Sequence, residues 1–192
     1  ELLFRTDENR RFFLQRFTHY LSPYADTYCW CLLPNHFHFL IKVKSAKEIR
    51  NRLLQQEKLK PVEKIYLEGK ESSSLLVEKA FHQFFTSYSM AFNKMHNRTG
   101  NLFNRPFKRI EVNRESQFTQ AIIYIHANPM KHKLVTDFTQ YYWSSWKAMI
   151  SEAATQLLRK ELIDWFGTKE QLIKAHFDLS EYYYDSEIAI ED

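Results

Sequence analysis

Two histidines that flank a single phenylalanine are the first residues whose spacing could support chemistry. His36, Phe37 and His38 lie within a stretch of apolar and aromatic residues. Successive side chains of a β-strand point to opposite faces, so His36 and His38 would project together from a strand. Two imidazoles on one face can bind one divalent metal ion. The pair could also be ordinary polar residues on the solvated face of a hairpin, and the motif alone leaves both interpretations open.

A second motif, YIHANP at residues 124–129, places a phenol near an amide. On a helix Tyr124 and Asn128 are four residues apart and therefore lie on one face. A tyrosine nucleophile could stand there beside a third metal ligand. Asn128 directly precedes a proline, a position biased away from the helical conformation, so we expect the helix to end there. A core tyrosine and a helix-capping asparagine would give the same pattern.

The elements that must position these motifs follow from hydrophobic periodicity and from helix and strand breakers. The pattern predicts helices over residues 7–21 (capped by Asp7), 46–57, 75–96 and 116–127, one or two more over 157–176, and strands over residues 27–33, 37–43 and 107–112. Pro34 and Asn35 form a turn that joins the first two strands into a hairpin. Residues 44–74 read as a polar connection, and Pro129 is expected to stop the helix that contains Tyr124.

This order of elements predicts an α+β fold, with a small antiparallel sheet and helices on one face. One further strand before residue 1 would complete the split βαβ, ferredoxin-like arrangement. The 192 residues and the 44% hydrophobic composition suit a soluble protein of one domain, or of one domain with an appendage. No stretch is apolar enough to span a membrane, and we expect no membrane partner. Cys29 and Cys31 form no disulfide framework, which indicates a reducing compartment.

The glycine content excludes two common classes of nucleotide-binding site. The chain has three glycines, Gly69, Gly100 and Gly167, and they lie far apart. A P-loop or a dinucleotide-binding loop needs several glycines within a few residues, so that backbone amides can approach phosphates. We therefore expect no chemistry that depends on either loop.

The charges are distributed unevenly along the chain. Residues 161–192 hold nine acidic side chains against two lysines, a net charge of −7, and the first 160 residues have a net charge of +11. Residues 94–114 are the densest basic stretch, with six lysines and arginines against one glutamate. Such a basic body indicates a polyanionic partner, although a solvated surface would have the same composition.

Taken together, these motifs resemble those of a known family. Residues 33–41 (LPNHFHFLI) resemble the HUH motif of the single-tyrosine transposases of bacterial insertion sequences. Residues 124–129, followed by Leu134 and Val135, are similar to the signature of the REP-associated tyrosine transposases. Further matches to that group are Phe92-Asn93-Lys94, residues 98–107 and Trp143-Ser144-Ser145. The resemblance covers roughly residues 1–147, with the motifs in the family's order.

The resemblance implies a reaction and a site. Tyr124 would attack a phosphodiester of single-stranded or hairpin DNA and form a 5′-phosphotyrosine intermediate with a free 3′-hydroxyl. Such covalent catalysis retains the energy of the broken bond for rejoining, without ATP. His36, His38 and Asn128 would bind Mg²⁺ or Mn²⁺, which polarises the scissile phosphate. The family's HUH domain would occupy residues 1–150, with residues 44–74 as an insertion and residues 151–192 as an acidic helical extension.

The residues that contact DNA are predicted from charge and aromatic content. Candidates for phosphate contacts are Arg98, Arg105, Lys108 and Arg109. Phe103 and Phe107 could stack on unpaired bases, although aromatic residues at such spacing are commonly part of a core. We interpret His126 as structural, because it points away from Tyr124 on the helix.

The sequence departs from the family in two places. Family members usually begin with a strand that would lie before residue 1, so one strand of the sheet is unaccounted for. The family's small residues after Asn-Pro are replaced by Lys131, His132 and Lys133, which add basic charge near the site. The acidic segment beyond about residue 150 lies outside the resemblance, and we expect it to be a solvated helical appendage.

Three other interpretations remain open. Cys29 and Cys31 could form a zinc site with His36 and His38 across the hairpin, although the cysteines read as part of a buried strand. The protein could bind DNA without cutting it, or it could be an HUH nickase of replication or conjugation. We expect a cytoplasmic protein, and either a monomer or a homodimer in which two chains exchange the tyrosine helix.

Overall fold

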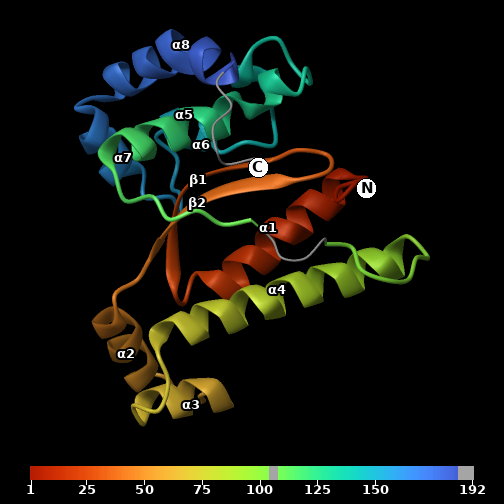
Figure 1. Cartoon of the computed structure of the whole chain (residues 1–192), viewed down its shortest axis with the longest axis vertical. Helices are drawn as coiled ribbons and strands as arrows, with labels where there is room; N and C mark the ends of the chain where they lie inside the picture. Colours follow the sequence, from red (N-terminus) through yellow and green to blue (C-terminus); the bar gives the residue numbers. More distant parts are fainter. Residues whose placement is uncertain (104–107, 186–192) are drawn as a thin grey trace. The chain divides into compact units, whose positions relative to one another are not determined.

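The chain folds into helices and one small β-sheet (Figure 1). This computed structural model describes residues 1–103 and 108–185, with side chains in the second range up to residue 180. Strands β1 (Ala25–Leu32) and β2 (Phe37–Val43) form a two-stranded antiparallel sheet. The fold class is therefore α+β, as predicted. None of the described helices combines the length and the apolar character that a membrane span requires.

The chain divides into two compact units. Unit 1 comprises Glu1–Phe4, Thr27–Ile41 and Arg105–Asp192, and unit 2 comprises Arg5–Asp26 and Lys42–Asn104. The helices of unit 2 are α1 (Asp7–Leu21), α2 (Ala46–Leu54), α3 (Pro61–Leu67) and α4 (Ser73–Met95). The helical elements of unit 1 are α5 (Glu115–Lys131), the short 3₁₀ helix η1 (Phe138–Gln140), α6 (Trp146–Ile150), α7 (Arg159–Phe166) and α8 (Lys169–Asp185).

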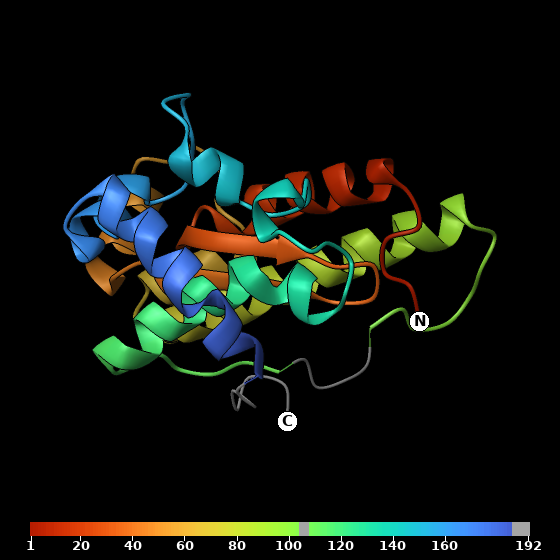
Figure 2. The ribbon, with the colours of Figure 1, turned by 90° about the horizontal axis from the view of Figure 1, so that it is seen from above.

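Unit 2 is built around α1 and α4, which lie side by side in Figures 1 and 2. Phe13 of α1 packs edge-on against Phe84 and Tyr88 of α4, with 4.8 Å between ring centroids in each pair. Such aromatic pairs add to the free energy gained by burial. The same aromatic periodicity predicted both helices close to their observed bounds.

The cap of α1 differs from the prediction. Thr6, not Asp7, is the N-cap residue: its hydroxyl accepts a hydrogen bond from the Asn9 N–H, and the Asn9 side chain accepts one from the Thr6 N–H. This reciprocal pair satisfies two backbone donors that the first turn leaves open. Asp7 instead lies in the first turn, where its carboxylate faces the positive end of the helix dipole.

The connection at residues 44–74 contains two helices where the sequence predicted one. α2 ends at Leu54, short of the predicted end at residue 57, and α3 follows it. α3 begins with Pro61, which suits the first helical position because its missing N–H has no partner there anyway. The Tyr66 hydroxyl donates to the Ala46 carbonyl at 2.9 Å and so ties the two helices together. The sequence analysis missed α3 because residues 44–74 are mostly polar and show little apolar periodicity.

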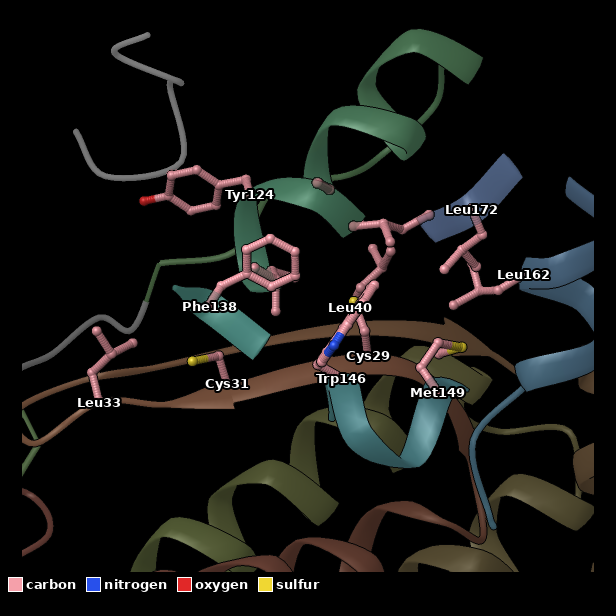
Figure 3. Close-up of a cluster of buried hydrophobic side chains, with 13 residues drawn as sticks. Cys29, Cys31, Leu33, Leu40, Tyr124, Phe138, Trp146, Met149, Leu162 and Leu172 are labelled. Atoms are coloured by element: carbon pink, nitrogen blue, oxygen red, sulfur yellow. The ribbon is translucent and has the colours of Figure 1, made fainter. Parts of the chain in front are cut away.

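The core of unit 1 lies between the hairpin and α5 (Figure 3). Cys29, Cys31 and Leu33 alternate along β1 and the turn, and all three are fully buried against α5. Leu40 of β2 joins them. The predicted hairpin is confirmed. Its β-branched and aromatic residues suit a half-buried pleated surface.

Helix α5 does not end before Pro129. It runs to Lys131 with Pro129 inside it, so the prediction that Asn128 marks the end of the helix is wrong. The helix ends in a Schellman motif, in which the Leu134 N–H donates to the Pro129 carbonyl at 2.9 Å and the Lys133 N–H to the Met130 carbonyl at 2.8 Å. Pro129 lies in the last turn of α5 and has no N–H to donate to the Ile125 carbonyl four residues earlier, so the helix continues without this one hydrogen bond of its ladder.

Lys133 occupies the position of this motif at which glycine is favoured. Its φ is +55°, in the left-handed region that side chains with a Cβ rarely adopt. We therefore expect Lys133→Gly to raise the free energy of unfolding by about 1 kcal/mol. Urea denaturation measures the change, and Lys133→Ala is the control. An equal gain from alanine would contradict the backbone explanation, since alanine keeps the strain and removes only the long side chain.

The acidic C-terminal segment is an integral part of unit 1 as far as the structure describes it. Leu162 of α7 and Leu172 of α8 are buried in the same core as the hairpin, and α8 lies along α5 in both views (Figures 1 and 2). The expectation of a solvated appendage is wrong for these helices, because their apolar residues face α5. Residues on both sides of position 150 thus contribute to unit 1.

The strand predicted over residues 107–112 is absent from the part of the segment that is described, residues 108–112. Lys108 to Glu111 are all exposed, so the apolar and polar residues do not separate onto two faces. The edge of β1 is occupied by other segments: the Leu32 N–H donates to the Trp143 carbonyl, and the Leu158 N–H donates to the Thr27 carbonyl. Phe107 lies outside the described residues.

Candidate active site

The two predicted imidazole ligands lie together at the start of β2. The rings of His36 and His38 are 5.0 Å apart between centroids and nearly perpendicular, at 87°. His36 Nδ1 is 2.8 Å from Asn35 Oδ1, and because an amide oxygen only accepts, Nδ1 carries the proton. In the neutral ring Nε2 then keeps its lone pair, which is the form that binds a metal ion. The Nε2 atoms of both histidines are buried.

Tyr124 faces this histidine pair from the middle of α5. Its ring packs edge-on against His38, with 5.5 Å between centroids, and the residue is only 1% exposed. Figure 3 shows the phenol at one end of the apolar cluster, directed away from Leu162 and Leu172. The predicted nucleophile and one predicted ligand are therefore in direct contact, although 86 positions separate them in the chain.

Asn128 lies between the two points at which the histidines touch α5. Residues 124, 128 and 132 follow at intervals of four and share one helix face. His38 contacts Tyr124 at one end of this row, and His36 contacts His132 at the other, with 4.7 Å between ring centroids. Asn128 in the middle of the row therefore faces the histidine pair.

The side-chain amide of Asn128 is buried without a hydrogen bond. The residue is 1% exposed, and neither Oδ1 nor Nδ2 has a hydrogen-bond partner in the described part of the chain. A buried polar group in this condition costs about 1–3 kcal/mol. Native proteins retain such groups rarely, and commonly for a functional reason. Among the described residues, its oxygen makes no hydrogen bond that a ligand would have to replace.

His132 was missed as a site residue by the sequence analysis, which counted it only as added charge. Its spacing of four from Asn128 was the signal that could have found it. That spacing places residues on one face only within a continuous helix, and the predicted stop at Pro129 removed His132 from the helix. The structure brings its exposed ring against His36.

Three of the four predicted DNA contacts belong to the described part of the chain, and they are divided between the two units. Lys108 and Arg109 are exposed residues of unit 1, the unit that contains the histidine pair. Arg98 belongs to unit 2, where its guanidinium donates to Asn93 Oδ1 at 2.6 Å. Arg105 lies outside the described residues. Phe103 packs at 4.8 Å from the ring of Phe85, which indicates a role in the core of unit 2.

The zinc interpretation finds no support in the structure. Cys29 and Cys31 are fully buried among apolar side chains, and this burial raises the pKa of both thiols. Thiolates are the form that binds zinc, so the environment disfavours it. Across residues 1–103 and 108–185, no group of three or more His, Cys, Asp or Glu side chains is placed to hold a metal ion. A metal at the histidine pair would need a ligand of another type, and the Asn128 oxygen is the candidate that the sequence predicted.

The comparisons with known proteins identify no relative. No family model, no curated protein and no solved structure matches this chain. The function is therefore inferred from the geometry of the site and from the sequence motifs.

A chain of hydrogen bonds anchors α5 on the side opposite to Tyr124. His176 Nδ1 donates to the Leu172 carbonyl at 2.8 Å, so its Nε2 accepts from His126 Nδ1 at 2.9 Å. His126 Nε2 then accepts from the Ser145 hydroxyl at 2.8 Å, which itself accepts from the Trp30 N–H. Every donor in this hydrogen-bond network has one acceptor, and both imidazole rings are neutral. His126 thus has the structural position that was predicted for it.

This network makes the stability of unit 1 sensitive to acid. Burial lowers the pKa of His176 to about 4 and moves the pKa of His126 well below its usual value. The unfolded chain therefore binds more protons than the folded one between pH 6.5 and pH 4, and stability present above pH 6.5 is lost as the pH falls. We expect His176 alone to account for a loss of about 2 kcal/mol at pH 5.

Urea unfolding at pH 7.5 and pH 5 tests this expectation. His176→Leu should be less stable than the wild type at pH 7.5, because it leaves the His126 donor without an acceptor, and should lose less on acidification. His82→Gln, at an exposed position of α4, is the control and should keep the wild-type difference. A wild-type protein whose stability is equal at the two pH values would contradict the burial of neutral imidazoles.

Proposed function

We propose that this chain is a metal-dependent endonuclease and strand transferase that acts on single-stranded or hairpin DNA, of the HUH single-tyrosine transposase type. The observation that carries the proposal is the buried Asn128 amide, which has no hydrogen-bond partner among the described residues and lies one helical turn from Tyr124, the residue that His38 contacts. The family is proposed from the sequence motifs. The buried Nε2 atoms of His36 and His38 are the other two proposed metal ligands.

The donors present fit a divalent cation. His36 and His38 would hold it through Nε2 and Asn128 through Oδ1, a set of two nitrogens and one oxygen that a substrate oxygen would join. Imidazole nitrogen favours Mn²⁺ over the harder Mg²⁺, so we expect Mn²⁺ to bind at lower concentration. When bound, the ion polarises the scissile phosphate.

The chain's own residues account for the covalent step. The phenol oxygen of Tyr124 loses its proton and forms a bond to phosphorus, while the bond from phosphorus to the 3′ oxygen breaks and that oxygen takes up a proton. The product is a 5′-phosphotyrosine and a free 3′-hydroxyl, and attack by a 3′-hydroxyl reverses the step to join strands. Because Tyr124 is 1% exposed, the proposal requires the site to open when DNA binds.

The same proposal includes the finer features that the family implies. β1 and β2 would form part of a ferredoxin-like sheet that is completed by further strands and covered by α5, and the protein would act in the cytoplasm. His38 and Tyr124 contact each other within one chain, which supports cleavage by a monomer without exchange of the tyrosine helix.

A covalent adduct assay tests the proposal. The protein is incubated with labelled single-stranded DNA hairpins that carry randomised flanks, with Mn²⁺ or with EDTA, and is then separated under denaturing conditions. We expect a labelled protein band with Mn²⁺ only. Tight binding of the hairpins without an adduct would contradict cleavage and would favour a DNA-binding protein without nuclease activity.

A further inference from the structure

The last turn of α5 places a cation over the ring of Tyr124. The Nζ atom of Lys131 lies 5.2 Å from the ring centroid. Lys131 follows Tyr124 by seven residues, about two helical turns, so the two side chains lie on the same helix face. This arrangement exists because α5 continues through Pro129, and the helix that holds the phenol therefore also fixes the position of the cation.

A purely structural role accounts for part of this contact. A cation over an aromatic ring contributes about 0.5–2 kcal/mol, and a lysine in the last turn is favoured by the helix dipole. The ring, however, belongs to the proposed nucleophile. Reacting atoms stand about 3–3.5 Å apart when a phosphate is positioned for attack. A phosphate at the Tyr124 oxygen therefore lies within reach of an ammonium group that already rests on the ring.

We propose that Lys131 binds a non-bridging oxygen of the phosphodiester that Tyr124 attacks, an inference that rests on the proposed function. The ammonium group donates a charge-assisted hydrogen bond to the anionic oxygen. It offsets the negative charge of the phosphate, which otherwise repels an oxygen nucleophile that is losing its proton. The ligand is the DNA backbone, so the contact is independent of base sequence.

Lys133 provides a matched comparison. It carries the same charge two residues farther on, but it is exposed and lies beyond the helix in the left-handed conformation. A general loss of positive charge would affect Lys131→Met and Lys133→Met equally. A contact with the scissile phosphate would affect only Lys131→Met.

The first test measures the rate of adduct formation at saturating DNA, with a cleavable hairpin obtained from the randomised pool. We expect Lys131→Met to lower this rate about 100-fold, Lys131→Arg to keep most of it, and Lys133→Met to leave it near the wild-type value. Equal rates for the two methionine variants would overturn the inference. An absence of adduct from the wild type would instead contradict the proposed function itself.

The second test removes the charge from the DNA. In the Tyr124→Phe background, which keeps the ring, binding is compared for a normal scissile linkage and for a methylphosphonate at that linkage. We expect the methylphosphonate to weaken binding when Lys131 is present and to have little effect in Lys131→Met, because the two changes remove the same contact. Additive losses of affinity would overturn the inference even if both methionine variants fold normally.

Discussion

Replacement of Tyr124 by phenylalanine is expected to abolish the covalent adduct while DNA binding persists. The substitution removes only the phenol oxygen, so the ring keeps its contacts with His38 and Lys131. Loss of a nucleophile lowers the rate of the covalent step by more than about 10⁴-fold. Denaturing electrophoresis of labelled DNA gives the adduct, and fluorescence anisotropy gives the affinity.

The matched control for this variant is Tyr142→Phe. Tyr142 is an exposed tyrosine of the same unit, and its ring packs edge-on against Trp143. We expect it to form the adduct at the wild-type rate. An adduct from Tyr124→Phe that equals that of the wild type would assign the nucleophile to another residue.

Replacement of Asn128 by leucine is expected to stabilise the metal-free protein. The amide is buried and has no hydrogen-bond partner in the part of the chain that the structure describes. An apolar side chain of similar size removes that penalty, so the free energy of unfolding should rise by about 1–3 kcal/mol in EDTA. The wild type should gain stability from Mn²⁺ by mass action, about 2.7 kcal/mol at 100 times the dissociation constant. Asn128→Leu should lose that gain, because it lacks the oxygen ligand.

Urea unfolding with EDTA and with Mn²⁺ measures both effects. Asn93→Leu is the control: the Asn93 side chain donates to the Gly100 carbonyl at 2.9 Å and accepts from Arg98, so its loss should destabilise the protein by about 1 kcal/mol. Stabilisation of Asn128→Leu, with destabilisation of Asn93→Leu, would identify the buried amide as a site retained for binding. Destabilisation of both variants would make Asn128 an ordinary structural residue.

The elements that the sequence predicted best are those with local signals. β2 has the predicted bounds, and α1 ends at the predicted residue, because the signals of apolar periodicity and of the turn at Pro34 and Asn35 act over a few positions. The contact between His36 and His38 also follows from local alternation. The meeting of His38 with Tyr124 does not, since nothing between the two motifs determines how the hairpin packs on α5.

The failures have a common physical origin in tertiary packing. Pro129 is a helix breaker by its chemistry, yet a Schellman motif and burial against the hairpin keep α5 intact around it. Lys133 adopts the left-handed backbone conformation that is usual for glycine, and the conformational preferences of lysine do not predict it. Leu162 and Leu172 of the acidic segment are buried in the core, because the free energy gained by apolar burial outweighs the preference of the neighbouring charged residues for solvent.

These failures also concealed part of the site. An intact α5 is what places Lys131 and His132 on the face that holds Tyr124 and Asn128. If the helix ended at Asn128, residues 131 and 132 would not share a helix face with Tyr124. The structure therefore adds two contacts, Lys131 on the nucleophile's ring and His132 on His36, to a site whose other members the motifs had indicated.

Mass spectrometry of the protein after incubation with hairpin DNA and Mn²⁺ tests the central claim most directly. After nuclease and protease digestion, the account predicts a nucleotide phosphate on the peptide that contains Tyr124, linked through the phenol oxygen, and none in the presence of EDTA. A nucleotide linked to a different residue, or cleaved DNA with an unmodified protein, would contradict the account.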